Sequence, residues 1–257
     1  MRTPKLAVVS AAVLFALAGC GQAADSGAGS PAAATTTAPA DPATLIEAAG
    51  KKVDQSSFKF SLETSGMKAE GVRHQPSQSM QMSMTGVSEG QEIKIDMISI
   101  AQDIWTKMDL GLDPGDDPAM QQLAEGLGKW TKTSADEAES QVGSFAGSGA
   151  QTMGSSMAKG LTGLKETAPG TFTGTVDITV NTDLDITEDE AALKALGDKA
   201  KSVPITITLD SEGRFSSIVV DIPAAGSTAA QKGTVKFYEY GDVPQPKAPP
   251  ADQVRTS

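Results

Sequence analysis

The sequence predicts an α+β protein built on one strongly curved antiparallel β-sheet of about ten strands, a half-barrel whose concave face is covered by helices. Apolar and polar residues alternate in nearly every segment after residue 57, which is typical of strands with one buried face. Turn-forming residues separate these segments at short intervals, so consecutive strands are expected to pair as hairpins. A sheet of this size tends to curl, and the predicted helices are the only available cover for its hollow side.

The first helix is predicted at residues 42–55, because Asp41 is suited to cap its N-terminus and Pro42 to occupy its first position. Its apolar stripe consists of Leu45, Ile46, Ala49 and Val53. Three further helices are expected: one from Asp117-Pro118 with Met120, Leu123 and Leu127; one within residues 134–170 with Met153, Met157, Leu161 and Leu164 on one face; and one from the capping-box residues Thr187 to Glu190 with Ala192, Leu193 and Leu196.

The strands are predicted where the period of the apolar residues changes to two. They are expected at residues 58–62, 67–73, 78–85, 91–100, 103–110, 129–132, 171–179, 204–210, 214–222 and 233–240. The sequence Asp210-Ser211-Glu212-Gly213 carries acidic side chains that suit calcium. Because it lies between two predicted strands, a tight hairpin turn is the simpler interpretation.

The N-terminus has the pattern of a secretory signal peptide over residues 1–19. Arg2 and Lys5 precede an apolar run at residues 6–17, which is too short to be a typical membrane span. Small residues then lead to Cys20 in the sequence LAGC, which resembles the bacterial lipobox. This resemblance implies that Cys20 receives diacylglycerol and a further acyl chain such as palmitate. We therefore expect an exported lipoprotein on the outer face of the cell membrane, held there by a stable lipid anchor.

Composition sets the remaining domain limits. Residues 20–41 comprise the lipidated cysteine and a flexible linker made almost wholly of Gly, Ala, Ser, Thr and Pro. Residues 42–243 are expected to form a single domain. The proline-rich tail at residues 244–257 is predicted to be disordered and not to pack.

The charge balance excludes some classes of partner. The whole chain has 21 basic and 32 acidic residues and a formal net charge of −11. Loss of Arg2 and Lys5 with the signal peptide would make the charge about −13, which opposes contact with nucleic acid and with anionic lipid headgroups. We expect no nucleic-acid partner, and contact with the membrane through the Cys20 anchor only.

The sequence gives little support to catalysis. Cys20 is the only cysteine and His74 the only histidine, so a Cys-His pair within the folded body is impossible and a Ser-His-Asp triad would depend on His74 alone. The acidic clusters lie at predicted turns and helix starts, where solvated carboxylates are common. We therefore expect neither an enzyme nor a cofactor.

Three methionines at every second position form one face of a predicted strand in the sequence SMQMSMT, residues 79–85. Three interpretations are open: ordinary core, the wall of an apolar cavity, or thioether ligands for Cu(I). To bind copper, methionine side chains that start about 7 Å apart along the strand would have to converge on one ion. His74, just upstream, is more simply a solvated turn residue. Periodicity alone does not separate a packed core from a lined cavity.

The predicted lining of such a cavity comes from three strands and a helix that serves as a lid. It consists of Met80, Met82, Met84, Ile93, Ile95, Met97, Ile104 and Met108 on the strands, and of Met153, Met157, Leu161 and Leu164 on the lid. Alternation places Trp105 on the face opposite Ile104 and Met108, so it is left out of the lining.

Several short sequences carry a resemblance to a known family. They are SFKF at 57–60, IWTKM at 104–108, GKW at 128–130, TGTVD at 173–177, LGDKAKSVP at 196–204, LDSEGRF at 209–215 and VVDIP at 219–223. Together with the lipobox and the order of elements, they make most of residues 42–243 similar to the actinobacterial LppX/LprAFG lipoproteins. That resemblance implies the LolA/LolB-like half-barrel fold, with an apolar cavity between sheet and helices. It also implies a role in binding acylated lipids or glycolipids and moving them through the actinobacterial envelope.

The expected function is thus that of a membrane-anchored lipoprotein that binds, and transfers, an apolar or acylated lipid. Its expected partners are the lipid itself and an envelope transporter or lipid-acceptor protein. The alternative is an interaction lipoprotein whose half-barrel is filled and whose outer surface docks an envelope protein. Copper binding by the methionines is a minor alternative.

Overall fold

The computed structural model describes residues 40–88, 90–111, 115, 117–134, 138, 149–180, 190–226 and 229–255. The predicted signal peptide, Cys20, the linker up to residue 39 and the capping-box residues 187–189 lie outside these ranges. The strands are β1 (Phe58–Glu63), β2 (Met67–His74), β3 (Ser79–Ser88), β4 (Gln91–Ile100), β5 (Asp103–Asp109), β6 (Thr131–Thr133), β7 (Leu161–Ala168), β8 (Thr171–Val176), β9 (Val203–Leu209), β10 (Phe215–Ile222) and β11 (Gln231–Tyr238). The α-helices are α1 (Pro42–Asp54), α2 (Pro118–Leu127), α4 (Gly149–Met157) and α5 (Glu190–Leu196), and short 3₁₀ turns lie at Gln75–Ser77, Gly197–Ser202 and Ala251–Gln253.

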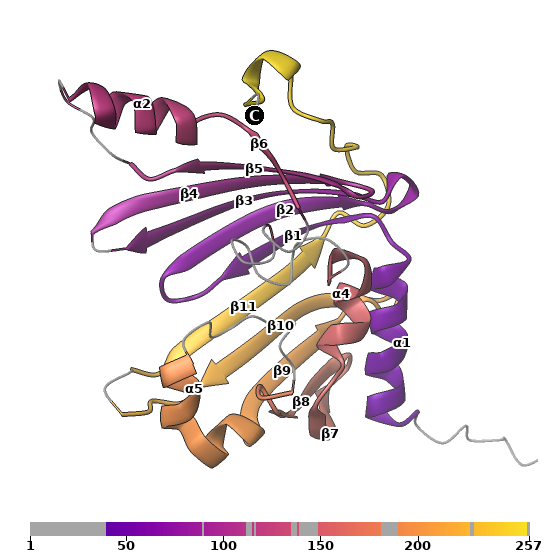
Figure 1. Cartoon of the computed structure of the whole chain (residues 1–257). Coiled ribbons are helices and arrows are strands. Elements are labelled where there is room, and N and C mark those ends of the chain that lie inside the picture. Colours follow the sequence, from indigo (N-terminus) through magenta and orange to yellow (C-terminus); the bar gives the residue numbers. More distant parts are fainter. Residues whose placement is uncertain are drawn as a thin grey trace, which may run out of the picture. The chain divides into compact units, whose positions relative to one another are not determined.

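All eleven strands belong to one antiparallel sheet in the order β6-β5-β4-β3-β2-β1-β11-β10-β9-β8-β7. The sheet is not closed, because β6 and β7 are its two edges. β1 and β11, from opposite ends of the domain, pair at its centre, with Phe60 opposite Phe237. Figure 1 shows the strands of the two halves turned toward the same side, as in a curved sheet. The expectation of one large antiparallel sheet is confirmed.

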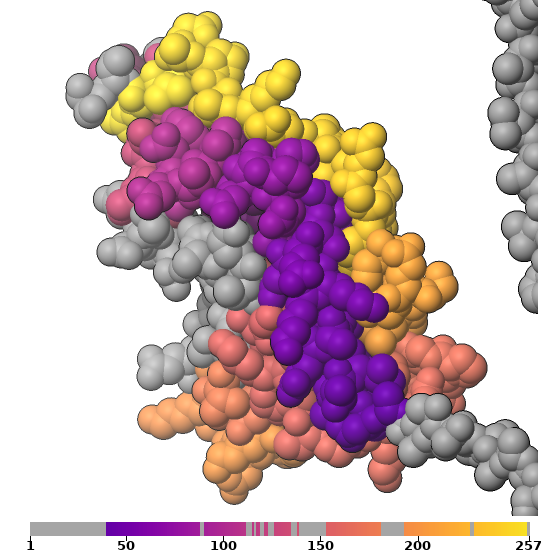
Figure 2. All heavy atoms as spheres, turned by 90° about the vertical axis from the view of Figure 1, so that its right-hand side faces the viewer, coloured from indigo at the N-terminus to yellow at the C-terminus, as the bar shows by residue number. Residues whose placement is uncertain are grey.

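Helix α1 forms where the sequence predicts it. The Asp41 carboxylate accepts a hydrogen bond from the Thr44 backbone N–H at 3.2 Å, and Pro42 opens the helix. The buried residues of α1 are Ile46, Ala49, Gly50 and Val53, which return at helical spacing. This face packs against α4 and the sheet. Figure 2 shows α1, in indigo, extending along this side of the molecule.

Buried Arg73 of β2 ties the C-terminal end of α1 to the sheet. Its Nη1 donates to the Val53 carbonyl at 3.0 Å and its Nη2 to the Asp54 carbonyl at 2.9 Å. Burial lowers the pKa of the guanidinium, and the nearby Asp54 carboxylate opposes this effect. The Val53 carbonyl also accepts the Ser56 backbone N–H at 3.0 Å, so Arg73 is its second donor. The last carbonyls of a helix lack an intrahelical partner, and Arg73 helps to satisfy those of Val53 and Asp54.

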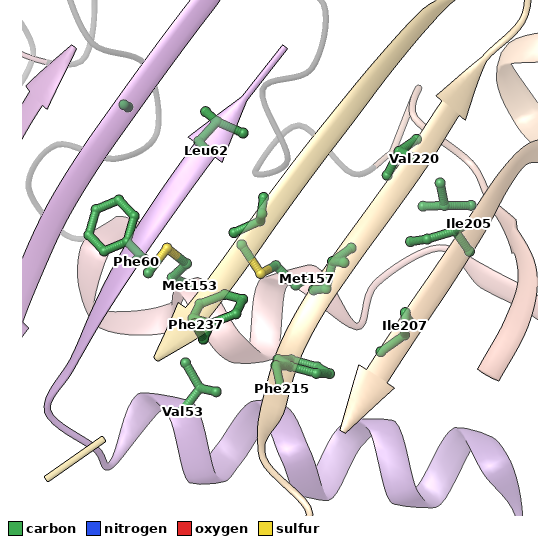
Figure 3. Close-up of a cluster of buried hydrophobic side chains, with 14 of the residues drawn as sticks. Val53, Phe60, Leu62, Met153, Met157, Ile205, Ile207, Phe215, Val220 and Phe237 are labelled. Atoms are coloured by element: carbon green, nitrogen blue, oxygen red, sulfur yellow. The ribbon is translucent and has the colours of Figure 1, made fainter. Parts of the chain in front are cut away.

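The core is one apolar cluster that includes residues from both halves of the sheet and from α1 and α4. Figure 3 shows Met153 and Met157 of α4 beside Phe60 and Phe237. Aromatic rings meet where the central strands pair, and the Phe58 ring lies edge-on to that of Phe237 with centroids 5.4 Å apart. Large side chains thus fill the centre of the sheet, which stabilises the β1–β11 pair by apolar burial.

Two predictions are wrong. Leu161 and Leu164 belong to strand β7 and do not continue the helix of Met153 and Met157, because α4 ends at Met157 and Gly160 follows with a φ of 70°. The described part of the proline-rich tail, up to residue 255, is packed. Pro246 is buried, and the Trp130 N–H donates to the Gln253 carbonyl at 2.9 Å.

Candidate functional site

One face of strands β2–β5 carries most of the predicted lining, and we call it the methionine face. Register arranges its residues in four rows across the strands. From the α1 end outward, these rows are Arg73-Met80-Ser99-Ile104, Gly71-Met82-Met97-Thr106, Ala69-Met84-Ile95-Met108 and Met67-Gly86-Ile93. The strands therefore bring together Met80, Met82, Met84, Ile93, Ile95, Met97, Ile104 and Met108, as the alternation predicts.

The exposed fraction of the side chains rises from the first of these rows to the last. In the two rows nearest α1, Met80 and Met82 are 2% exposed and Met97 is 1% exposed. Met84 in the third row is still buried at 8%, but its neighbours Ile95 and Met108 are only partly buried. In the last row both Met67 and Ile93 are partly buried. The methionine face is thus filled core at one end and incompletely covered at the other.

The four predicted lid residues lie elsewhere. Met153 and Met157 of α4 are buried at the centre of the sheet, beside Phe60, Phe215 and Phe237 (Figure 3). Leu161 and Leu164 lie on β7, at the edge of the sheet farthest in strand order from β5. The predicted lining is therefore split between two regions of the sheet.

Sequence reasoning missed the contribution of β2 to the methionine face. Gly71 lies between Phe60 of β1 and Met82 of β3, and a Cβ on it would lie 2.8 Å from the Gln81 carbonyl oxygen. Its missing side chain makes room for the Phe60 ring, which covers this part of the sheet. Alternation within residues 67–73 signals this face, but which strands lie next to β2 is a matter of tertiary pairing.

A hollow of about 320 Å³ lies at the exposed end of the methionine face. It is lined by Thr64, Ser65, Gly66, Met67, Lys68, Thr85, Gly86 and Val87. These residues belong to the β1–β2 turn and to the adjoining ends of β2 and β3. Met67 and Gly86 come from the last row of the methionine face, whereas Lys68, Thr85 and Val87 lie on the opposite face, so the hollow is at the rim of the sheet. The hollow adjoins the part of the methionine face that is least covered.

The opposite face of β3–β5 is polar and carries paired charges. The Asp96 carboxylate lies 3.2 Å from Lys107 Nζ and 3.5 Å from Lys94 Nζ. Burial by itself would raise the pKa of Asp96, but hydrogen bonds from Ser83 and Lys107 and the two lysine charges hold the pKa below its ordinary value. This face thus carries charged groups that meet water, whereas the methionine face is mostly apolar and is covered at its α1 end.

Both tryptophans lie on the polar side of the sheet. Trp105 is opposite Ile98 and Lys132 in the ladder, and Lys132 Nζ lies 5.7 Å from its ring centroid. Lys107 Nζ lies 5.1 Å from the ring centroid of Trp130. Trp105 thus lies on the face opposite Ile104 and Met108, as alternation predicts.

The position of His74 does not support copper binding by the methionines. Its Nδ1 lies 2.7 Å from Ser77 Oγ, and it is opposite Ser79 in the ladder, on the other face of the sheet from Met80. Among the described residues, no group of three or more His, Cys, Asp or Glu side chains could hold a metal ion. The methionines would thus have to bind copper without this histidine.

Comparison with known proteins does not place the chain in a family. The chain matches no protein-family model and no curated protein sequence. None of the helices within the described ranges is long and apolar enough to cross a membrane.

Proposed function

We propose that this protein is a lipid-anchored, exported lipoprotein of the LppX/LprAFG type, and that it holds an acylated lipid between the curved sheet and the helices on its concave side. The observation that carries the proposal is the gradient of exposure on the methionine face. A fully packed core would bury Ile93, Ile95 and Met108 as completely as Met82 and Met97. Partly covered apolar side chains, continuous with a packed core, suit a hydrocarbon chain that completes the packing.

Binding of this kind needs no covalent chemistry. Methionine has three rotatable bonds and a polarizable sulfur, so Met84 and Met108 can adjust to chains of different length and saturation. Each methylene group removed from water contributes roughly 0.8 kcal/mol. Affinity would therefore follow the length of the acyl chain more closely than the chemistry of its headgroup.

The first test is lipid extraction followed by mass spectrometry of the full chain carrying Cys20→Ser, which removes the proposed anchor and its covalently attached acyl groups. We expect a stoichiometric acylated species that is not covalently bound. A ligand-free protein that also fails to enhance the fluorescence of cis-parinaric acid would refute the proposal.

Variants on β3 and β4 separate binding from folding. Ile95→Trp on the methionine face would fill the ligand's space, and we expect cis-parinaric acid to bind about tenfold or more weakly, a loss of about 1.4 kcal/mol. Glu92→Trp is the matched control, because Glu92 is exposed and lies on the opposite face of β4. Met82→Trp, in the closed rows, should instead destabilise the fold by overpacking.

A specific observation favours the second candidate function, an interaction lipoprotein with a filled half-barrel. Met80, Met82 and Met97 are as buried as the central phenylalanines, so half of the methionine face is already packed. Under this alternative, Ile95→Trp would lower stability, the protein would carry no lipid, and docking of an envelope partner would depend on the polar face.

A further inference from the structure

The methionine face is closed at one end and partly open at the other. At the α1 end, Arg73 is 4% exposed and its guanidinium is bound to the Val53 and Asp54 carbonyls. This end is closed by a charged group whose hydrogen bonds are made within the protein. Figure 1 shows α1 at this end of the strands and the β1–β2 turn at the other. A hydrocarbon chain could not pass Arg73 without breaking its hydrogen bonds, so only the other end can serve as an entrance.

The hollow at the opposite end has an amphipathic lining. Met67, on the methionine face, and Val87, which lies on the opposite face of β3 at the rim of the sheet, supply apolar surface. Val87 is 66% exposed, more than any other large apolar side chain in the described part of the chain. Thr64, Ser65 and Thr85 supply hydroxyl groups around the same hollow. A surface that combines apolar area with hydrogen-bonding groups suits the junction between a hydrocarbon chain and its polar headgroup.

Two glycines line this hollow. Gly66 lies in the β1–β2 turn and Gly86 lies in the last row of the methionine face. A Cβ on Gly86 would lie 3.3 Å from the Gly66 carbonyl oxygen, which is a tight contact. Any side chain at residue 86 would therefore project into the hollow and crowd the turn.

We propose that the β1–β2 turn forms the entrance of the lipid site, and that the ligand is an amphiphile with a hydrogen-bonding headgroup. Its chain would lie along Ile93, Ile95 and Met108, and its headgroup would stay among the hydroxyl groups of the hollow. Lys68 adds a cation at the rim, which is paired with Glu63 at 3.1 Å. This inference rests on the proposed function, since it gives a location and a polarity to the same binding site.

A fluorescent label at the entrance tests the location. In the full chain with Cys20→Ser, Val87→Cys provides a single thiol for the environment-sensitive dye acrylodan. Ser211→Cys, at an exposed turn between β9 and β10 in the other half of the sheet, is the matched control. On titration with palmitic acid, we expect a saturable emission shift for the label at residue 87 and no shift for the label at residue 211.

A rate measurement tests the route independently of the label. Ile93→Trp would narrow the path from the hollow to the third row, and we expect the association rate constant of cis-parinaric acid to fall about tenfold. Lys236→Trp, at an exposed position on the outward face of β11, should leave that rate unchanged. Urea unfolding of both variants shows whether the fold is intact.

The possible results separate the two proposals. If cis-parinaric acid binds, but the label at residue 87 is silent and Ile93→Trp does not change the rate, the entrance lies elsewhere and lipid binding stands. If neither cis-parinaric acid nor palmitic acid binds to the parent chain, both the entrance and the proposed function are refuted.

Discussion

Gly50 of α1 and Gly154 of α4 meet backbone to backbone. A Cβ built on Gly50 would lie 2.5 Å from the Gly154 carbonyl oxygen, and one built on Gly154 would lie 2.7 Å from the Val53 Cβ. Asp54 completes this crossing, because its carboxylate accepts hydrogen bonds from the Gly154 N–H at 2.8 Å and from the Ser155 N–H and hydroxyl group. Close approach of the two backbones and the Asp54 hydrogen bonds therefore join α4 to α1, in addition to the burial of Met153 and Met157 in the core.

Gly154→Ala should therefore destabilise the protein. Alanine normally favours an α-helix over glycine by about 1 kcal/mol, so a loss of stability would identify the steric conflict. We expect the free energy of unfolding in urea to fall by about 1–3 kcal/mol, as in overpacked cores. Gly66→Ala is the control, because a Cβ there meets nothing within 4 Å. Equal stability of the two variants would contradict the close crossing.

Arg73→Met should cost about 3 kcal/mol of stability, because it removes the guanidinium donor of the Asp54 carbonyl and leaves the Val53 carbonyl with the Ser56 N–H only. Methionine has a similar length, so loss of packing volume is a minor contribution. Lys68→Met on the same strand is the control, since the Lys68 side chain is exposed and its ion pair with Glu63 should contribute less than about 1 kcal/mol. Urea midpoints of the two variants are the measurement, and a small effect at Arg73 would show that water replaces the guanidinium.

Asp96 should give the protein a specific sensitivity to acid. Its folded-state pKa is lowered, so its contribution to stability is present above the unfolded-state pKa of about 4 and is lost as the pH falls through the folded-state value. Asp96→Asn should therefore lower stability at pH 7 and flatten the decline of stability with pH below about 4.

The control for that experiment is Asp221→Asn on β10. Asp221 and Lys232 form an exposed ion pair at 3.3 Å, and such pairs contribute little to stability. Thermal unfolding between pH 2 and 7 compares the variants. A decline with pH in Asp96→Asn as steep as in the parent chain would assign the acid sensitivity to other carboxylates.

The C-terminal segment, residues 242–255, should stabilise the β6 edge of the sheet. Trp130 makes two backbone hydrogen bonds to it, accepting from the Arg255 N–H at 2.7 Å and donating to Gln253. A stop codon after Gly241 should cost about 1–3 kcal/mol and expose the Trp130 amide to hydrogen exchange. A stop codon after Arg255 is the control. Unchanged protection of Trp130 in the shorter chain would show that the segment only rests on the surface.

The proposed lipid anchor at Cys20 should determine whether the protein partitions into detergent or into water. With intact Cys20 we expect the protein to partition into the detergent phase of a Triton X-114 extract, and with Cys20→Ser into the aqueous phase. Metabolic labelling with radioactive palmitate should mark the parent chain only. Labelling of the Cys20→Ser chain would assign the lipid to another residue.

Local pattern was sufficient for most of the secondary structure. A strand alternates with a period of two whatever it pairs with, so Met80, Met82 and Met84 could be assigned to one face from the sequence alone. Capping is equally local, and Asp41-Pro42 marked the first residue of α1 correctly. The same reasoning gave the outward orientation of Trp105.

Local pattern was insufficient where long-range contacts choose the structure. Leu161 and Leu164 are three residues apart, which suits a helix, yet pairing with β8 through a register shift makes them part of a strand. The tail reads as disordered from its prolines, but Trp130 provides backbone groups for it to bind. Both errors arise because the deciding partner is distant in sequence.

The sequence by itself determined most of the strands, which face of each of them is apolar, and the signal and anchor expected at the N-terminus, because each of these depends on neighbours along the chain. Only the tertiary structure decided that β1 pairs with β11, that Gly50 meets Gly154, and that the methionine face is closed by Arg73 and left partly uncovered at Ile93. Those features depend on which surfaces remain uncovered once distant segments have packed, and side-chain period carries no information about that.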